Sequence, residues 1–283
     1  MLNRNVETFL GCDASFEEAS TVLFGAPFDS TTSYRPGARF GSAAIRHESY
    51  GLETYSPYLD RDLEDLSVMD SGDLELCLGN SEKALEQIEE RARIILEAGK
   101  RPFLLGGEHL VTLGAFRAVW KRFPDLRLIH FDAHTDLRDD YLGCRLSHAC
   151  VIRRCQELVG DGRIFQFGIR SGDRSEWRWG KEHVSTVPFT FENLAETLAQ
   201  LQGLPVYFTL DLDVLDPSVF PGTGTPEPGG VSFDALRRAA TLVCQKARVV
   251  ACDVNELSPP YDPSGISTAV ACKMVREMLL ALG

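Results

Sequence analysis

The sequence predicts an α/β fold in which one doubly wound, mainly parallel sheet forms a single domain over residues 1–283. Short apolar runs alternate with amphipathic stretches along the whole chain, as they do when strands and helices alternate in a parallel sheet. The apolar runs lack strict polar alternation, which indicates that both faces of the sheet are covered. No linker, low-complexity tract or internal repeat interrupts this pattern.

Six strands and six helices are expected. The strand candidates are TVLFGAP (21–27), RPFLLGG (101–107), LRLIHFD (126–132), RIFQFGI (163–169), PVYFTLDLD (205–213) and RVVACDVNE (248–256). The helix candidates are 81–98, 110–122, 149–158, 192–202, 232–246 and 266–281. The first helix is the clearest, because its apolar residues recur at helical spacing, Asn80 or Ser81 can cap its start and Gly99 can end it.

The composition excludes several classes of protein. The 29 Lys and Arg residues against 41 Asp and Glu give a net charge of −12, which disfavours binding to nucleic acid or to anionic membranes. No signal peptide is recognisable, and no apolar run reaches the roughly 18 residues of a membrane span. Eight cysteines without a secretory signal read as reduced thiols. The sequence therefore predicts a cytoplasmic protein.

Side chains that can carry chemistry follow four of the six predicted strands. They are Glu108 and His109, Asp132, Asp211 and Asp213, and Asp253 and Glu256. In an open parallel sheet, ligands bind beyond the carboxyl ends of the strands. The sequence therefore predicts a shared site at this edge of the sheet.

The stretch LIHFDAHTDLRDD (128–140) places Asp132, His134 and Asp136 at alternate positions. On an extended strand, residues two apart lie about 6–7 Å from each other. Asp132 and Asp136 would then be about 13 Å apart, too far to share one metal ion. We therefore expect the chain to leave the strand at Asp132 and curl. His130 is expected to lie in the core or behind the metal ligands.

Two further segments supply similar groups. Asp211 and Asp213 in TLDLDVLDP repeat the alternating arrangement on another strand. His109 follows LLGGE, where Gly106 and Gly107 allow the backbone to pass close to its neighbours. Together with the first segment, these residues give two histidines and four aspartates.

The number and type of these groups indicate a pair of metal ions. Six ligands are too many for a structural zinc site, which takes four and prefers thiolate or imidazole. Two divalent ions that share two bridging aspartates would each have four protein ligands. An oxygen-rich shell with one imidazole per ion suits Mn²⁺. Such a pair can hold a bridging hydroxide and lower its pKa toward neutrality.

The motifs around these residues resemble those of the ureohydrolases, the arginase and agmatinase family, over nearly the whole chain. They are LLGGEHLVTLG, HFDAHTDLR, the Ser-His pair at 147–148, TLDLDVLDPSVFPGTGTPEPGG, DVNELSPPYD, SYRPGARFGSAAIR (33–46) and YLDRDLEDLSVMDSGD (58–73). The pattern is most similar to the bacterial agmatinases. The resemblance implies an arginase-like three-layer α/β/α sandwich that assembles as a homo-oligomer, either a trimer or a hexamer.

The resemblance also implies the cofactor, two Mn²⁺ per subunit, with Asp132 and Asp211 as bridges. One ion would be bound by His109, Asp132, Asp136 and Asp211, and the other by Asp132, His134, Asp211 and Asp213.

The catalytic roles follow from the same resemblance. Glu256 matches the glutamate that binds the substrate guanidinium, for which a carboxylate is suited by charge-assisted hydrogen bonds. His148 matches the histidine that contacts the substrate and delivers a proton to the leaving amine, and a pKa near neutrality is expected for it. Asp136 would orient the metal-bridging hydroxide that attacks the guanidinium. Thr225, in GTGTP, would line the substrate site.

The expected substrate is agmatine, a small cationic guanidino compound whose hydrolysis gives putrescine and urea, a step of polyamine biosynthesis. The loop LRDDYLGCRLSH lacks the Asn and paired polar residues with which arginases bind the amino-acid head of arginine. Asp139, Asp140 or the acidic surface could accommodate the distal amine. Aminopropylagmatine, guanidinobutyrate and arginine remain alternative substrates.

Other classes of protein fit less well. A binuclear phosphoesterase would need further Gly-Asp and Gly-Asn-His clusters. A deacetylase-like zinc enzyme would need fewer ligands and a catalytic tyrosine. A non-catalytic protein that binds metal or a guanidino ligand is the remaining alternative. A lost ligand would mark it, and none is lost here.

Overall fold

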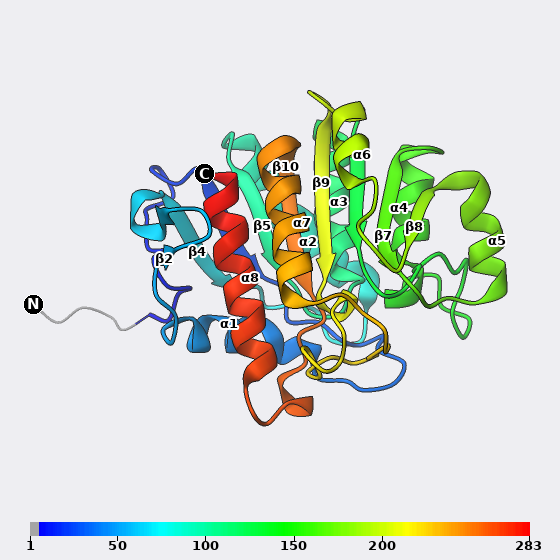
Figure 1. Ribbon diagram of the computed structural model, residues 1–283, viewed down its shortest axis with the longest axis horizontal. Coiled ribbons are helices and arrows are strands. Elements are labelled where there is room, and N and C mark those ends of the chain that lie inside the picture. Colours follow the sequence, from blue (N-terminus) through cyan, green and yellow to red (C-terminus); the bar gives the residue numbers. More distant parts are fainter. Residues whose placement is uncertain (1–5) are drawn as a thin grey trace, which may run out of the picture.

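The computed structural model describes residues 6–283, which are built around one eight-stranded sheet (Figure 1). Its strands are β1 (Thr21–Gly25), β4 (Val68–Asp73), β5 (Arg101–Leu105), β6 (Arg127–Phe131), β7 (Ile164–Ile169), β8 (Ser185–Pro188), β9 (Pro205–Asp211) and β10 (Arg248–Asn255). All neighbouring strands pair in parallel. Strands β2 (Tyr55–Ser56) and β3 (Arg61–Asp62) form a separate antiparallel pair.

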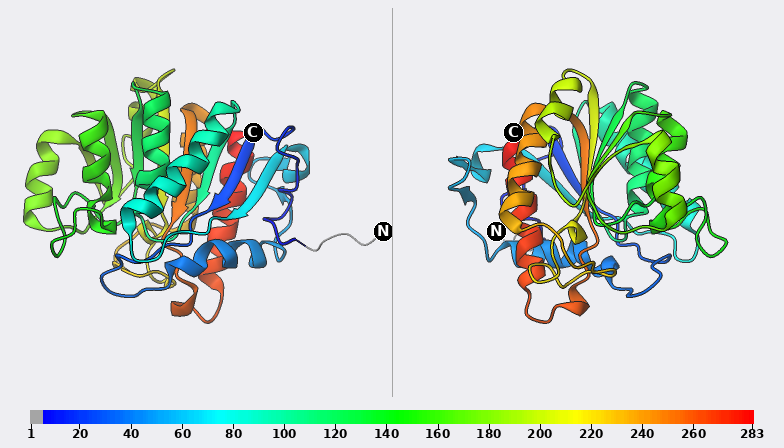
Figure 2. Two further views of the ribbon diagram at one scale, coloured as in Figure 1. Left: turned by 180° about the vertical axis from the view of Figure 1, so that it is seen from behind. Right: turned by 45° about the vertical axis from the view of Figure 1, so that its right-hand side comes forward.

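Helices cover both faces of the sheet. They are α1 (Gly41–Ser49), α2 (Ser81–Glu97), α3 (Val111–Arg122), α4 (Val151–Val159), α5 (Arg174–His183), α6 (Leu194–Gln200), α7 (Phe233–Lys246) and α8 (Ile266–Leu282). One buried apolar cluster joins α2, α3 and α4 to the sheet, and the other joins α6, α7 and α8 to its opposite face (Figure 2). The predicted α/β/α sandwich is thereby confirmed. Within residues 6–283, no helix combines the length and apolarity needed to cross a membrane.

The six predicted strands and six predicted helices are all present, with ends that differ by a few residues. The first predicted helix is capped as expected, because Asn80 Oδ1 accepts a hydrogen bond of 3.0 Å from the Lys83 N–H. Gly99, with φ of +74°, follows the end of α2. These local signals are sufficient because they depend on residues close in the sequence.

Four elements of the sandwich were missed: β4, β8, α1 and α5. Strand β4 is polar, and its Asp70 pairs at 2.7 Å with the buried Arg46 of α1. This contact joins residues 24 positions apart and stabilises the polar strand in the sheet. Because the strand is polar, its sequence shows no apolar pattern that would have predicted it. Strand β8 is a short edge strand that ends at Pro188, a position where proline is tolerated.

The order of the strands is β4-β1-β5-β10-β9-β6-β7-β8. The last two strands of the chain, β9 and β10, therefore lie between β5 and β6. As a result, the four strands that are followed by candidate site residues are consecutive neighbours in the sheet. Their carboxyl ends meet at one edge, where Figure 1 shows the long connecting loops.

Candidate metal centre

The ends of β6 and β9 turn in the same way. The Asp132 carboxylate accepts a hydrogen bond of 2.6 Å from the His134 N–H, and the Asp211 carboxylate accepts one of 2.8 Å from the Asp213 N–H. An aspartate that bonds the backbone two residues on closes a tight turn. The Ala133 N–H also donates to Asp213 Oδ1 at 3.1 Å, which ties the two turns together. The predicted curl after Asp132 is thus present.

His109 is brought into the site by the two glycines before it. A Cβ atom at Gly107 would lie 2.1 Å from the Phe28 carbonyl oxygen, and one at Gly106 would lie 1.8 Å from Asn255 Oδ1. No side chain fits at either position, so the backbone after β5 packs directly against its neighbours. This close packing explains the glycine pair in LLGGEH.

The Nδ1 atom of His109 faces three carboxylates. It lies 3.0 Å from Asp132 Oδ2, 3.0 Å from Asp136 Oδ2 and 3.4 Å from Asp211 Oδ2. None of these oxygens is aligned for a hydrogen bond, so within residues 6–283 this buried nitrogen has no hydrogen-bond partner. His109 Nε2 contacts Thr209 Oγ1 at 2.9 Å. The Nδ1 lone pair and the three carboxylates point to the same place without bonding to one another. This arrangement fits a divalent cation bound between them.

A second group of ligand atoms lies next to the first. His134 Nδ1 is 3.0 Å from Asp213 Oδ2 and 3.4 Å from Asp132 Oδ1. Asp132 therefore belongs to both groups, as a bridging ligand must. Asp136 completes the set with a left-handed backbone, at φ of +52°, a conformation that costs energy in a non-glycine residue and is found where function requires it.

His130 lies behind the ligands, as expected, although it is close enough to belong to a metal-binding group. Its Nε2 is 2.8 Å from Asp132 Oδ2, and its Nδ1 is 3.0 Å from the Gln166 side-chain amide. Both ring nitrogens are thus engaged by protein groups. This arrangement orients the Asp132 carboxylate from behind.

The charges of the buried carboxylates are unbalanced within the protein. Burial and the neighbouring Asp213 and Asp132 raise the pKa of Asp211 well above its usual value. Burial and Asp132 raise the pKa of Asp136 to about 7. Burial would also raise the pKa of Asp132, but His130, His109 and His134 hold it well below its usual range. Cations bound at the site would relieve this repulsion.

The metal-free protein is expected to lose stability as the pH rises from about 4 to 8. Asp136 has an ordinary pKa of 3.8 and a folded pKa of about 7, so the folded state holds the extra proton and stability falls across that window. Burial lowers the pKa of His134, but Asp213 and Asp132 raise it well above 6.5, so its contribution is present below pH 6.5 and is lost above it. Both effects have the same sign. We expect the Tm without metal to be on the order of 5 °C lower at pH 8 than at pH 5.5.

Calorimetry of the protein with and without Mn²⁺ checks this expectation. Saturating Mn²⁺ should remove the decline, because the ions replace the protons. A metal-free Tm that rises from pH 5.5 to 8 would contradict the electrostatics described above.

Glu256 follows β10 and faces the same space. It has a left-handed backbone, at φ of +67°, and its Oε1 accepts a hydrogen bond of 2.7 Å from the His109 N–H. Burial, Glu108 and Asp213 raise its pKa well above the usual value. Among the described residues, no Lys or Arg forms an ion pair with it. A cation from outside the protein would complete this site.

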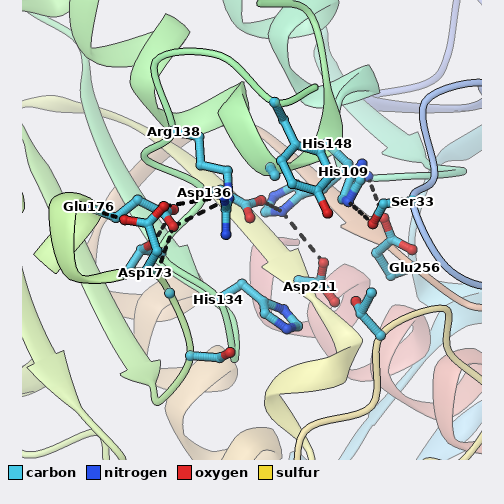
Figure 3. A pocket seen from close by; sticks show the side chains of 16 residues that line it. Ser33, His109, His134, Asp136, Arg138, His148, Asp173, Glu176, Asp211 and Glu256 are labelled. Atoms are coloured by element: carbon cyan, nitrogen blue, oxygen red, sulfur yellow. Dashed lines mark hydrogen bonds and ion pairs between the residues drawn. The ribbon is translucent and has the colours of Figure 1, made fainter. Parts of the chain in front are cut away.

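Above the cluster lies a cavity of about 430 Å³ (Figure 3), within the range of small-molecule sites. It is lined by His109, His134, Asp136 and Asp211 together with the predicted substrate residues His148, Thr225 and Glu256. Thr225 Oγ1 donates to Asp213 Oδ2 at 3.3 Å. The structure thus brings all of the predicted site residues together, while their individual roles stay predictions.

The pKa of His148 differs from the expected value. Burial lowers its pKa to about 4, so the expected value near neutrality is not found. The imidazole is neutral at pH 7 and must accept a proton before it can pass one on. Its Nε2 lies 3.2 Å from Ser33 Oγ and its Nδ1 lies 3.3 Å from Ser147 Oγ.

The outer part of the cavity is lined by residues that sequence reasoning missed. Arg138 lies 3.2 Å from Asp173 and 3.4 Å from Glu176 (Figure 3). Asp173 and Glu176 form the capping box at the start of α5. The spacing D-x-x-E was a readable signal for this helix start.

Asp139 and Asp140, proposed to receive a distal amine, do not line the cavity. Asp139 is 66% exposed and pairs with Arg154 at 2.8 Å. Asp140 accepts a hydrogen bond from the Gly143 N–H at 3.0 Å. Neither residue is therefore available at the cavity for a distal amine, because each is engaged by a partner outside it.

Comparisons with known proteins agree with this arrangement. Residues 19–281 match the family model of the arginase family. The chain is 48% identical to the agmatinase of Bacillus subtilis, over 97% of this chain and 96% of that protein. It is 37% identical to the N(1)-aminopropylagmatine ureohydrolase of Thermococcus kodakarensis, over 89% of this chain and 88% of that protein. The crystal structure of the agmatine ureohydrolase of Thermoplasma volcanium superposes with a TM-score of 0.89 at 34% identity, over 99% of this chain and 95% of that one.

Proposed function

We propose that this chain, which belongs to the arginase family, hydrolyses agmatine to putrescine and urea with two Mn²⁺ ions bound at the candidate metal centre. Its relatives and its family make it a ureohydrolase. The observation that carries the proposal is the position of Glu256, a buried carboxylate without a cationic partner in the described chain, beside six convergent metal-ligand side chains.

The residues present fit two divalent ions. The four carboxylates balance four positive charges, and the two imidazoles supply one nitrogen to each group. Asp132 would be shared by both ions, since it contacts both histidines. Asp211, at the end of β9 beside β6, contacts His109 and would be the second shared ligand. When bound, such ions lower the pKa of a shared water toward neutrality and so supply a nucleophile. The choice of Mn²⁺ rests on the oxygen-rich ligand set.

Glu256 binds and orients the guanidinium. Its backbone contact with the His109 N–H fixes one oxygen, and the second is left for the N–H groups of the planar cation. Because this bond ties the loop after β10 to the loop that carries His109, a guanidinium bound by Glu256 would lie beside the ligand cluster. Holding the reacting carbon in a fixed position lowers the barrier to attack on it.

His148 transfers a proton, and Asp136 accepts a hydrogen bond, during the reaction. Since the His148 imidazole is neutral at pH 7, it accepts a proton during the attack and delivers it to the departing amine nitrogen. Asp136 Oδ2 lies beside His109 at the floor of the cavity, in position to accept a hydrogen bond from the nucleophile. Thr225, held by its bond to Asp213, also lines the cavity.

The outer cavity supports agmatine over arginine. Arg138 is the sole Lys or Arg among the described residues that line the cavity, and it is already paired with Asp173 and Glu176. A substrate carboxylate would have to displace one of these partners. A substrate amine instead meets an excess of carboxylates, since Asp173 is still 40% exposed.

Urea release from a panel of guanidino compounds tests the proposal. The Mn²⁺-loaded protein should hydrolyse agmatine with a kcat/KM at least about 100-fold above that for arginine, because a charge mismatch at the distal end costs several kcal/mol. Aminopropylagmatine, guanidinobutyrate and guanidinopropionate complete the panel. Faster release from arginine would overturn the substrate, and a preference for guanidinobutyrate would assign Arg138 to a substrate carboxylate.

A further inference from the structure

The loop that follows β1 contacts His148, the residue proposed to move protons. We call residues 26–37 the β1-exit loop. Ser33 Oγ of this loop lies 3.2 Å from His148 Nε2 (Figure 3), and Thr31 Oγ1 accepts a hydrogen bond of 3.1 Å from the His148 backbone N–H. These segments are more than 100 positions apart in the chain, so the contact is purely tertiary.

Thr31 is itself held by a buried carboxylate. Its hydroxyl donates to Glu108 Oε1 at 2.5 Å, and its backbone N–H donates to Glu108 Oε2 at 3.0 Å. A threonine hydroxyl has one proton. Because that proton is donated to Glu108, Thr31 Oγ1 can only accept the hydrogen bond from the His148 N–H. The direction of the contact is therefore fixed.

The rest of the loop is anchored as well. Asp29, 3% exposed, accepts a hydrogen bond of 2.8 Å from the Gly37 N–H and forms an ion pair with Arg39. A Cβ atom at Gly37 would lie 2.4 Å from Ser258 Oγ, so only glycine lets the loop pack there. These contacts give a physical role to the motif SYRPGAR, which the metal centre leaves unexplained.

We propose that Thr31 is a positioning residue, which transmits the fixed geometry of Glu108 to His148 and so holds the imidazole over the substrate. The inference rests on the proposed function, because it assigns Thr31 to the step in which His148 acts. We expect Thr31 to act mainly on turnover, since it does not line the cavity and reaches it only through His148.

Thr32 provides a matched control. Its Oγ1 donates to the same carboxylate, at 3.0 Å from Glu108 Oε2, and no hydrogen bond joins it to His148 in the described chain. Thr31→Val and Thr32→Val each remove one hydroxyl from Glu108, but only the first removes the contact with His148. Thr31→Ser keeps both contacts of the hydroxyl.

Two measurements test the proposal with the Mn²⁺-loaded protein. Thr31→Val should lower kcat for agmatine about tenfold, the effect of one lost hydrogen bond, with KM within about twofold. Thr32→Val and Thr31→Ser should stay within about threefold of the unaltered protein. Hydrogen exchange at the His148 amide, measured without substrate, should be faster in Thr31→Val and unchanged in the other two variants.

The outcomes separate this proposal from the proposed function. Equal losses of kcat in Thr31→Val and Thr32→Val would show that Glu108 alone matters, which would overturn the role of Thr31. An unchanged His148 amide or an unchanged kcat in Thr31→Val would also overturn it. Absence of urea from every guanidino compound would reject the proposed function, whereas the exchange measurement would still decide whether Thr31 holds His148. If Thr31→Val fails to fold, Thr31→Ala replaces it in both measurements.

Discussion

Replacement of Asp132 by asparagine is expected to remove both metal ions and to lower kcat/KM by more than about 10⁴-fold. Asp132 contacts both histidines of the cluster, His109 at 3.0 Å and His134 at 3.4 Å. An amide keeps the size of the side chain but loses the charge and one lone-pair oxygen. Metal content by plasma mass spectrometry, together with urea release, gives the measurement.

His134→Ala provides the graded comparison. Among the described carboxylates, His134 pairs with Asp213 and Asp132 alone, so its loss should reduce metal content to about one ion per subunit. Two ions retained in Asp132→Asn, or an equal loss in both variants, would contradict the bridging position of Asp132.

Replacement of Glu256 by glutamine is expected to lower kcat/KM for agmatine about 10³-fold while both ions stay bound. The glutamine oxygen can still accept the hydrogen bond from the His109 N–H, so the metal centre keeps its shape. What is lost is the buried negative charge opposite the guanidinium, and an unpaired charge in such a site costs about 2–5 kcal/mol. Steady-state kinetics with parallel metal analysis checks this expectation, and a kcat/KM within tenfold of the unaltered protein would remove Glu256 from guanidinium binding.

Much of the fold followed from local patterns. The six strands and helices that were predicted have apolar runs or capped amphipathic stretches, and both depend on residues within one element. Elements without such a pattern were missed. The polar strand β4 is acceptable only because Asp70 meets Arg46 from another segment, and α5 is short and strongly polar, with only Glu176 and Gly180 buried.

The candidate site residues could also be identified from the sequence. Asp132 and Asp211 bond the backbone two residues on, so the alternating motifs around them encode their own turns. The pKa of His148 could not be predicted from the sequence, because burial by other segments lowers it to about 4. The roles of Arg138 and Thr31 depend on partners from distant loops and were missed for the same reason.

The sequence by itself determined which side chains end the strands and how each strand end turns. The tertiary structure decided that β9 and β10 lie between β5 and β6, which makes the four strand ends with candidate site residues neighbours. It also decided that the β1-exit loop reaches His148. The physical reason is the range of the interactions involved. Turns and caps are set by hydrogen bonds between residues a few positions apart, whereas strand order and loop contacts arise from packing between segments that only the folded chain brings together.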